Sequence, residues 1–500
     1  MSTTWAGDAQ PLTVLGIDVG TSSIRALLYD SDGNAVSGVE SQIAYVPETA
    51  PDGRVTVDPK ELFNLLAAVI DEVVARAKVA GIAPTAVAMS CFWHSFIALD
   101  QSAQPLTPVL LWADTRAGAV IPELSKQVDV RRLHRRTGCR LHASYWPAKI
   151  VWLGSTDPSV FRRSARYVSF AEYVCIRLFG SASVSVSMAS GTGLLNTATC
   201  EWDEYALSIL PSGVDYRLSP IDDSPRSGIT TEFAGRWPSL ASIPWYPAYG
   251  DGACSNIGAT GLGMSSAFVL TVGTSAAIRS VTVEPASKRP AGVSISPALW
   301  HYRVDRDHGI VGGALSEGGN LIAWLEATTR LPPLAEAEVA IAKRAPDAGA
   351  LTVLPFIAGE RSPDWTTGSR ATFAGITLAT QPLDLLQAAM ESISYELRSI
   401  FESMVDALGD PENVFAAGAA LARSPVWLQI IANVVGSPLR LAPQIESSSR
   451  GAALLVLDRL GVGPGQSVEA DTQPLVRPFR TEGYAGAMAR QQILRKRMSE

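Results

Sequence analysis

The sequence predicts an α/β protein of two domains, and three observations carry this prediction. The chain has 500 residues, which is longer than one hydrophobic core usually organises. Residues 15–25 and 270–279 are two versions of one pattern, in which Gly-Thr-Ser separates two apolar runs. Copies that lie half a chain apart indicate a duplicated domain. Runs with the spacing of strands and of helices also alternate along the chain, as they do in α/β domains.

The composition limits the class of protein. With 47% hydrophobic and 18% charged residues, the chain resembles well-packed soluble proteins. The net charge of −7 argues against a general nucleic-acid binder, and the basic cluster at 131–140 is typical of a solvated helix face. No apolar run is long enough to span a bilayer. We therefore expect neither a nucleic-acid partner nor a membrane.

The cysteines and the first residues bear on the compartment. The five cysteines are scattered and form no CxxC pair, which is typical of reduced thiols rather than of a disulfide or zinc framework. Residues 1–11 lack the basic start and the apolar centre of a signal peptide. These observations predict a cytoplasmic protein.

The first half follows a strand-helix-strand order. Apolar, β-branched runs predict strands at 12–19 and 24–29. Apolar residues at helical spacing then predict a helix over 59–80, which Pro59 opens at a first-turn position. A buried-type strand at 86–90 follows, and this order favours an α/β domain.

The two halves meet near residue 250. Irregular Pro- and Ser-rich sequence over 211–247 ends at Tyr249-Gly250-Asp251-Gly252. We therefore place an N-terminal domain at 1–250 and a C-terminal domain at 251–500. In the second half, the apolar spacing predicts a strand at 268–272, a helix at 383–408, a strand at 414–417 and a helix at 426–435.

Both copies of the repeated pattern predict a hairpin whose tip suits a phosphate oxygen, because Gly lets the backbone come close and small donors point outward. The first tip comprises Gly20, Thr21, Ser22 and Ser23, and the second contains Gly273 and Thr274. Asp18 precedes the first tip, whereas Thr271 stands at that place in the second. A carboxylate there could hold Mg²⁺. An ordinary turn Asp is the alternative, and the second copy favours phosphate binding.

Asp251 is a candidate general base. It lies between two glycines at the proposed domain junction, where a carboxylate could face a cleft and take a proton from a substrate hydroxyl. The alternative is a turn Asp that its Gly neighbours favour.

Two short segments have the side chains of a polyhydroxylated-ligand site. Trp93 and His94 follow the strand at 86–90, and strand ends are where α/β proteins usually bind ligands. Trp112 and Arg116 place an aromatic plate and a fork-shaped cation close together. The alternatives are a satisfied core histidine and a buried tryptophan beside a surface ion pair.

Three glycine-rich turns, at 312–313, 318–319 and 418–420, would allow the backbone to approach a base or ribose closely. None of them forms a GxxxxGK[ST] or GxGxxG motif.

In combination, these residues resemble the FGGY carbohydrate kinases, the sugar-kinase branch of the actin-like ATPase superfamily. The resemblance runs from about Leu12 to about Gly461. Its most specific part is Ala371–Ile376 with the following Asp384-Leu385 and Ala388–Glu391. The other family signature contains Lys149, Trp152 and Leu153, with Trp146 where a small residue or Pro is usual.

The resemblance implies an α/β fold of two actin-like (ribonuclease-H-like) ATPase domains with an interdomain cleft. Sugar would bind mainly to the first domain and Mg-ATP mainly to the second, with ATP and Mg²⁺ as cofactors. Partners would be small molecules, and homodimers are common in such kinases. The implied roles are metal binding for Asp18, phosphate or nucleotide binding for Gly20, Thr21, Ser22, Ser23, Gly273, Thr274, Gly312, Gly313, Gly418 and Ala419, and catalysis for Asp251.

Within the family, the chain is most similar to gluconate kinases, on segments 94–95, 112–116, 190–194, 273–279 and 358–363. The resemblance therefore implies ATP-dependent phosphorylation of a terminal hydroxyl of a sugar acid, most of all gluconate.

The residues expected to contact the substrate are Trp93, His94, Trp112, Arg116 and Asp251, and Trp93 stands where gluconate kinases usually have Met. Arg116, or Arg361 as a second candidate, would bind the substrate carboxylate as a bidentate pair.

Other functions stay open at this point. A kinase for a neutral ketose or polyol (xylulose, ribulose, glycerol or erythritol) is the main alternative. A non-catalytic sugar sensor with the same fold and a filament-forming protein are the others. Retention of both Asp18 and Asp251 argues against the sensor, which needs no base.

Overall fold

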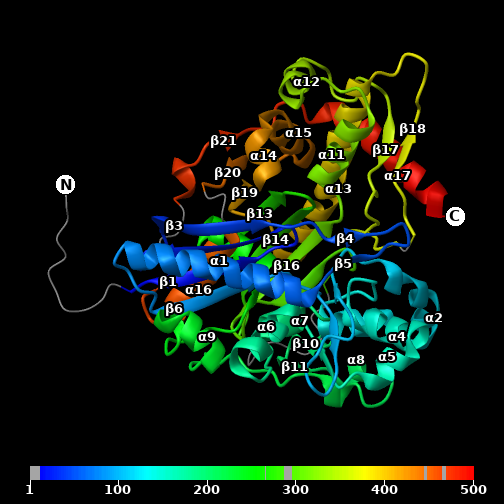
Figure 1. Ribbon diagram of the computed structural model, residues 1–500. Helices are drawn as coiled ribbons and strands as arrows, with labels where there is room; N and C mark the ends of the chain where they lie inside the picture. Colours follow the sequence, from blue (N-terminus) through cyan, green and yellow to red (C-terminus); the bar gives the residue numbers. More distant parts are fainter. Residues whose placement is uncertain are drawn as a thin grey trace, which may run out of the picture.

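The computed structural model describes residues 12–264, 266–285, 295–366, 368–443, 447–463 and 469–499. Two large sheets organise it (Figure 1). The first has the strand order β12-β6-β1-β2-β3, and the second has the order β15-β16-β14-β13-β19-β20-β21. The first strand of each sheet, β1 or β13, pairs antiparallel with the strand that follows it in the chain and parallel with a later strand on its other side, β6 or β19. A further antiparallel strand, β3 or β16, pairs with β2 or β14, and a further parallel strand, β12 or β20, pairs with β6 or β19. This shared order confirms the α/β fold and the predicted duplication.

The strands have the following bounds: β1 Val14–Val19, β2 Ser23–Tyr29, β3 Ala35–Ala44, β4 Glu48–Thr49, β5 Val55–Val57, β6 Ala86–Cys91, β7 Ile97–Leu99, β8 Val109–Leu110, β9 Arg166–Val168, β10 Leu195–Asn196, β11 Glu201–Trp202, β12 Tyr249–Gly250, β13 Ala267–Val272, β14 Ala276–Val283, β15 Trp300–Arg303, β16 His308–Leu315, β17 Thr352–Leu354, β18 Thr372–Ala374, β19 Asn413–Ala417, β20 Leu439–Leu441 and β21 Leu475–Val476.

The α-helices have the following bounds: α1 Pro59–Val79, α2 Ile121–Gln127, α3 Val130–Thr137, α4 Trp146–Thr156, α5 Pro158–Arg163, α6 Phe170–Phe179, α7 Val186–Ser190, α8 Glu204–Ser208, α9 Thr231–Arg236, α10 Asp251–Thr260, α11 Gly319–Thr328, α12 Leu334–Ile341, α13 Pro382–Leu408, α14 Ala419–Arg423, α15 Pro425–Val435, α16 Ser447–Arg459 and α17 Ala485–Ser499.

The repeated hairpins and the long helices have simple causes in the sequence. All six residues of β1 are buried, as its apolar run predicts. Helix α1 begins at Pro59 because Asp58 accepts hydrogen bonds from the first free backbone N–H groups, and such a cap stabilises a helix by about 1 kcal/mol. Its apolar residues at helical spacing are buried along one face, which packs against β2 and β3.

The first sheet brings two distant carboxylates to one edge. Strands β1, β6 and β12 are parallel, with Asp18 opposite Ser90 and Gly250 opposite Cys91. Asp251 directly follows β12. Because parallel strands end at the same edge, both acids lie there, with β6 between their strands.

The predicted boundary at residue 250 separates the strands of the two sheets but not the helices. Strand β12 is the last strand of the first sheet, and β13 belongs to the second. Helix α16, however, returns from the C-terminal part of the chain to pack against β1 and β6 (Figure 1). Its apolar residues Ala452–Leu457 belong to the core of the first domain. The reason is that α16, with α10 beside it, covers an apolar face of this sheet.

Candidate active site

The first hairpin tip lies between β1 and β2. It is closed by a hydrogen bond from the Gly20 N–H to the Ser23 carbonyl, 3.0 Å long. Thr21 and Ser22 reach the surface, whereas Ser23 is buried. The predicted tip is therefore formed, but the Ser23 hydroxyl faces inward and accepts a hydrogen bond from Arg25.

Asp18 is held just before this tip. The Ser90 hydroxyl donates to its Oδ1 at 2.8 Å, and the Nε of Arg25 lies 3.9 Å from its Oδ2. Burial raises the pKa of Asp18 to about 6, against the opposite effects of Arg25 and Ser90, and Asp251 adds to the rise.

The second tip, between β13 and β14, meets two glycine-rich turns. The Gly319 N–H donates to the Gly273 carbonyl at 2.7 Å, and the Asn320 N–H donates to the Thr274 carbonyl. Gly319 also lies close to Ala420, and Gly418 has a φ of +100° against the Val272 backbone. The sites predicted at 273–274, 318–319 and 418–420 are thus brought together.

Gly312 and Gly313 do not belong to this cluster. Both are buried in the middle of β16. A Cβ on Gly312 would lie 3.1 Å from the Cγ of Arg279, and one on Gly313 would lie 2.5 Å from Ile400. These glycines allow close packing, and their predicted nucleotide contact stays a prediction. Gly318 and Gly319, a few residues later, lie against the second tip instead.

A cavity lies between the domains, within about 580 Å³ of space that includes open solvent. Its lining comes from segments that follow strands of the first sheet, from the second sheet and from loops: Trp93, His94, Trp112, Ser144, Tyr145, Asp251, Ser275, Arg279, Trp300, Tyr302, Ala314, Arg361 and Trp365. Four of the five residues predicted to contact substrate are among them.

Asp251 lies at the start of α10, and its Oδ1 accepts a hydrogen bond from the Gly252 N–H at 2.8 Å. Burial raises the pKa of this carboxyl, and Arg279 is the strongest opposing charge. A partly buried carboxylate with a raised pKa in a cleft has the properties of a general base.

Trp93 forms a rigid part of the cavity lining. Its side chain is nearly buried, and its Nε1 donates to the Ser187 carbonyl at 2.9 Å. A Cβ on Gly191 or Gly250 would overlap the indole, and one on Gly252 would lie 2.8 Å from it. The two glycines beside Asp251 are therefore explained by the indole and not only by a turn.

His94 is a neutral hydrogen-bonding group. Its φ is +68°, and its Nδ1 makes a hydrogen bond with the Gly191 carbonyl. Burial lowers the pKa of His94 to about 3. The buried Lys149 donates to the His94 carbonyl at 2.7 Å and to the Leu111 carbonyl at 3.0 Å, and so ties the His94 segment to the end of β8.

The two arginines that were candidates for binding the substrate carboxylate have different surroundings. The Arg361 guanidinium lies 4.2 Å from the centre of the Trp112 ring and lines the cavity. Arg116 instead forms an ion pair of 2.6 Å with Asp114 and stacks over Trp152 at 4.7 Å. It is not among the lining residues of the cavity, so its contact with substrate stays a prediction, and Arg361 is the candidate that lines the cavity.

Several lining residues escaped the sequence analysis. Trp300 and Tyr302 stack at 4.2 Å on β15 and meet the edge of Trp93. The Tyr302 hydroxyl also makes a hydrogen bond with Tyr145 across the cavity. Arg279 belonged to the second copy of the repeat and could have been noticed there, whereas no pattern marked the others.

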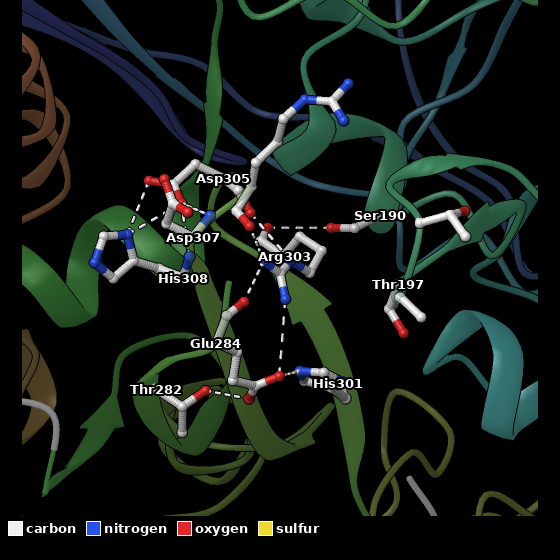
Figure 2. A network of polar contacts seen from close by, with 12 residues as sticks. Ser190, Thr197, Thr282, Glu284, His301, Arg303, Asp305, Asp307 and His308 are labelled. Atoms are coloured by element: carbon white, nitrogen blue, oxygen red, sulfur yellow. Dashed lines mark hydrogen bonds and ion pairs between the residues drawn. The ribbon is translucent and has the colours of Figure 1, made fainter. Parts of the chain in front are cut away.

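A polar network behind this lining fixes the β15–β16 hairpin, as Figure 2 shows. The buried Arg303 donates to the carbonyls of Glu284 and Asp305, at 2.7 and 3.0 Å. The Ser190 hydroxyl of the first domain donates to the Arg303 carbonyl at 3.2 Å, and His301 pairs with Glu284. The aromatic residues of β15 are thereby held against the first domain.

Comparison with known proteins identifies the family. Residues 13–258 match the N-terminal domain of the FGGY family of carbohydrate kinases, and residues 268–457 match its C-terminal domain. The chain belongs to this family. The resemblance predicted from the motifs is confirmed, the protein is a carbohydrate kinase, and family membership implies ATP use.

Among its relatives, the gluconokinases of Bacillus licheniformis and Bacillus subtilis (strain 168) are each 27% identical over 90% of this chain and 88% of their own. The xylulose kinase of Staphylococcus xylosus is 23% identical over 88% of this chain and 90% of its own.

Two solved structures from Lactobacillus acidophilus are similar throughout. A gluconate kinase has a TM-score of 0.84 at 25% identity, covering 98% of this chain and 99% of its own. A ligand-bound xylulose kinase has a TM-score of 0.83 at 25% identity, covering 97% and 98%. Within the described residues, no helix is long and apolar enough to cross a membrane.

Proposed function

We propose that this carbohydrate kinase transfers the γ-phosphoryl group of ATP to a terminal hydroxyl of a sugar acid, most of all gluconate. The observation that carries the proposal is the partly buried Arg361 guanidinium, which lines the same cavity as Asp251. A guanidinium suits a substrate carboxylate because its donors match both oxygens. The similarity to gluconokinases supports the same substrate.

In this proposal Asp251 is the base of the reaction. Its carboxylate orients the terminal hydroxyl and takes its proton as the oxygen attacks the γ-phosphorus. The bond between that phosphorus and the bridging oxygen breaks, and ADP leaves with the electron pair. The raised pKa of Asp251 suits a group that must both accept and release a proton.

The phosphates of ATP would lie between the two hairpin tips. We assign them to the backbone and hydroxyls of Gly20–Ser22 and of Gly273-Thr274. Gly319 and Ala420, which lie beside the second tip, would bring the backbone close to the ribose and base. The Ala419-Ala420 pair is compatible with this role because it adds only methyl groups.

Asp18 is the proposed Mg²⁺ ligand. The described residues contain no group of three acids, histidines or cysteines that could hold a metal by themselves. Mg²⁺ usually takes one or two carboxylates together with phosphate oxygens and water, so Asp18 beside the first tip fits a metal that arrives with the nucleotide. When bound, Mg²⁺ neutralises phosphate charge.

The remaining lining would recognise the hydroxyl groups and the carbon chain of the substrate. The Nδ1–H of the neutral His94 donates to the Gly191 carbonyl, so its Nε2 can accept a hydrogen bond from a substrate hydroxyl, and the Ser144 and Tyr145 hydroxyls are further partners. Trp93 and Trp112 offer apolar faces to the C–H groups. The carboxylate would bind Arg361, where stacking on Trp112 fixes the guanidinium.

The test is a coupled ADP-release assay with Mg-ATP across gluconate, other aldonates, xylulose, ribulose, glycerol and erythritol. We expect turnover with gluconate and none with the neutral ketoses. Turnover with a ketose or polyol alone would contradict the substrate and leave the kinase chemistry. A neutral ketose is the second candidate, because the xylulose kinase structure is nearly as similar as the gluconate kinase structure.

The compartment and the assembly complete the proposal. The five cysteines are free thiols in the structure, which supports a cytoplasmic enzyme. The homodimer that the family resemblance implies stays a prediction.

A further inference from the structure

Arg279 lines the cavity from β14, the strand that follows the second hairpin tip. A Cβ on Gly312 would lie 3.1 Å from its Cγ, and one on Gly252 would lie 3.0 Å from its Nε. Two glycines on separate elements thus leave the space through which this side chain passes to the start of α10. Its guanidinium therefore lies beside Asp251.

Within the described part of the chain, this guanidinium makes no hydrogen bond and no close ion pair, and its charge interacts with that of Asp251. Its Nε is buried without a hydrogen bond, and Asp251 is the acid whose charge most affects it. Burial lowers the pKa of Arg279 to about 10, so the group is still charged at neutral pH. A partly buried cation whose Nε has no hydrogen bond, in a cavity beside Asp251, favours an anion that enters the cavity.

The position of Arg279 indicates which anion would bind its guanidinium. Ser275 from the second tip, Arg279 and Asp251 line one cavity. A phosphoryl group that leaves a nucleotide at the second tip for a hydroxyl at Asp251 must cross this space. Arg361 differs, because it stacks on Trp112 and already donates to the Leu315 carbonyl.

We propose that Arg279 is a catalytic residue whose guanidinium binds the oxygens of the phosphoryl group in transit. This inference rests on the proposed role of Asp251 as base. As the hydroxyl proton passes to Asp251, the substrate oxygen bonds to the γ-phosphorus, the bond to the bridging oxygen breaks, and its electron pair leaves with ADP. Negative charge is then spread over three equatorial oxygens. The donors of Arg279 offset that charge without reorganising.

The experiment compares Arg279→Met, Arg279→Lys and the matched control Arg361→Met in the full-length kinase. For Arg279→Met we expect kcat to fall about 10³-fold, the lower end for an arginine in phosphoryl transfer, with the KM values for ATP and sugar little changed. Arg279→Lys should retain more activity because it keeps the charge. For Arg361→Met, the KM for the sugar acid should rise instead.

A rescue assay excludes a merely structural role. Guanidinium ion added to Arg279→Ala should restore part of kcat, whereas the same concentration of sodium chloride or urea should not. Absence of rescue in a variant that unfolds at the wild-type temperature would overturn the proposal. A rise in the KM for the sugar acid with unchanged kcat on a neutral polyol would also overturn it, because Arg279 would then bind the carboxylate.

These outcomes differ from failure of the proposed function. A wild-type enzyme that phosphorylates only neutral sugars would refute the sugar-acid substrate, yet the effect of Arg279→Met on kcat would still be measured with that sugar.

Discussion

The indole of Trp93 leaves no room for a side chain at Gly250, and this permits a sharp test. The backbone of Gly250 has φ −68° and ψ 137°, values that alanine adopts readily. A Gly250→Ala change therefore causes no backbone strain and isolates the steric effect. Its Cβ would meet three atoms of the indole, all well inside the 3.0 Å that real Cβ atoms keep.

The size of the effect follows from two opposing contributions. Overpacking a rigid core costs about 3 kcal/mol, since the indole is fixed by its hydrogen bond to the Ser187 carbonyl. Alanine lowers the conformational entropy of the unfolded chain relative to glycine, and this offsets about 0.7 kcal/mol of that cost. We expect Gly250→Ala to lower the free energy of unfolding by about 2 kcal/mol and to reduce kcat, because Asp251 is the next residue.

The assay is a double-mutant cycle between Gly250→Ala and Trp93→Met. Urea unfolding measures the stability of each variant, and ADP release measures its activity. In the Trp93→Met background, where the flexible thioether can move aside, Gly250→Ala should cost less than about 1 kcal/mol. Equal costs in both backgrounds would refute the argument that the indole excludes a side chain at Gly250.

The remaining predictions concern the proposed roles. Asp251→Asn should keep ATP binding, measured by calorimetry, while single-turnover transfer falls about 10³-fold; near-wild-type turnover would exclude it as the base. Because burial raises the pKa of Asp251 above 3.8, the carboxylate is protonated at acid pH, and kcat should rise with pH along a limb that Asp251→Asn lacks. Asp18→Ala should raise the Mg²⁺ concentration needed for half-maximal rate, and an unchanged Mg²⁺ titration would make Asp18 a turn residue. Arg116→Ala should leave the preference for gluconate over a neutral polyol unchanged, and a selective loss of gluconate turnover would restore its role in binding.

The regular elements could be predicted because their causes are local. The helix expected at 59–80 is α1, Pro59–Val79, and the strand expected at 86–90 is β6. In each of these elements, the apolar residues recur at a regular spacing, and residues next to the element mark where it begins and ends. The duplicated hairpin was visible for the same reason, since Gly-Thr-Ser and its flanking strands are short, continuous segments.

The site was predicted less completely because its lining comes from many elements. Trp300 and Tyr302 reach the cavity from an edge hairpin of the second sheet, and no sequence period records that long-range contact. For Gly312, the sequence shows a Gly-Gly pair but not which pair lies against the hairpin tip. For Arg116, the sequence does not show that the guanidinium pairs with Asp114, the acid two residues away.

The return of α16 to the first domain has a consequence for synthesis of the chain. The first sheet is complete once Gly250 has been made, but Ser447, the first residue of its covering helix, follows about 200 residues later. At about 5–20 residues per second, this interval lasts roughly 10–40 s. During that time the apolar face that β1 and β6 later share with α16 emerges from the ribosome without its cover. The second domain is thus made while the first still awaits its last layer.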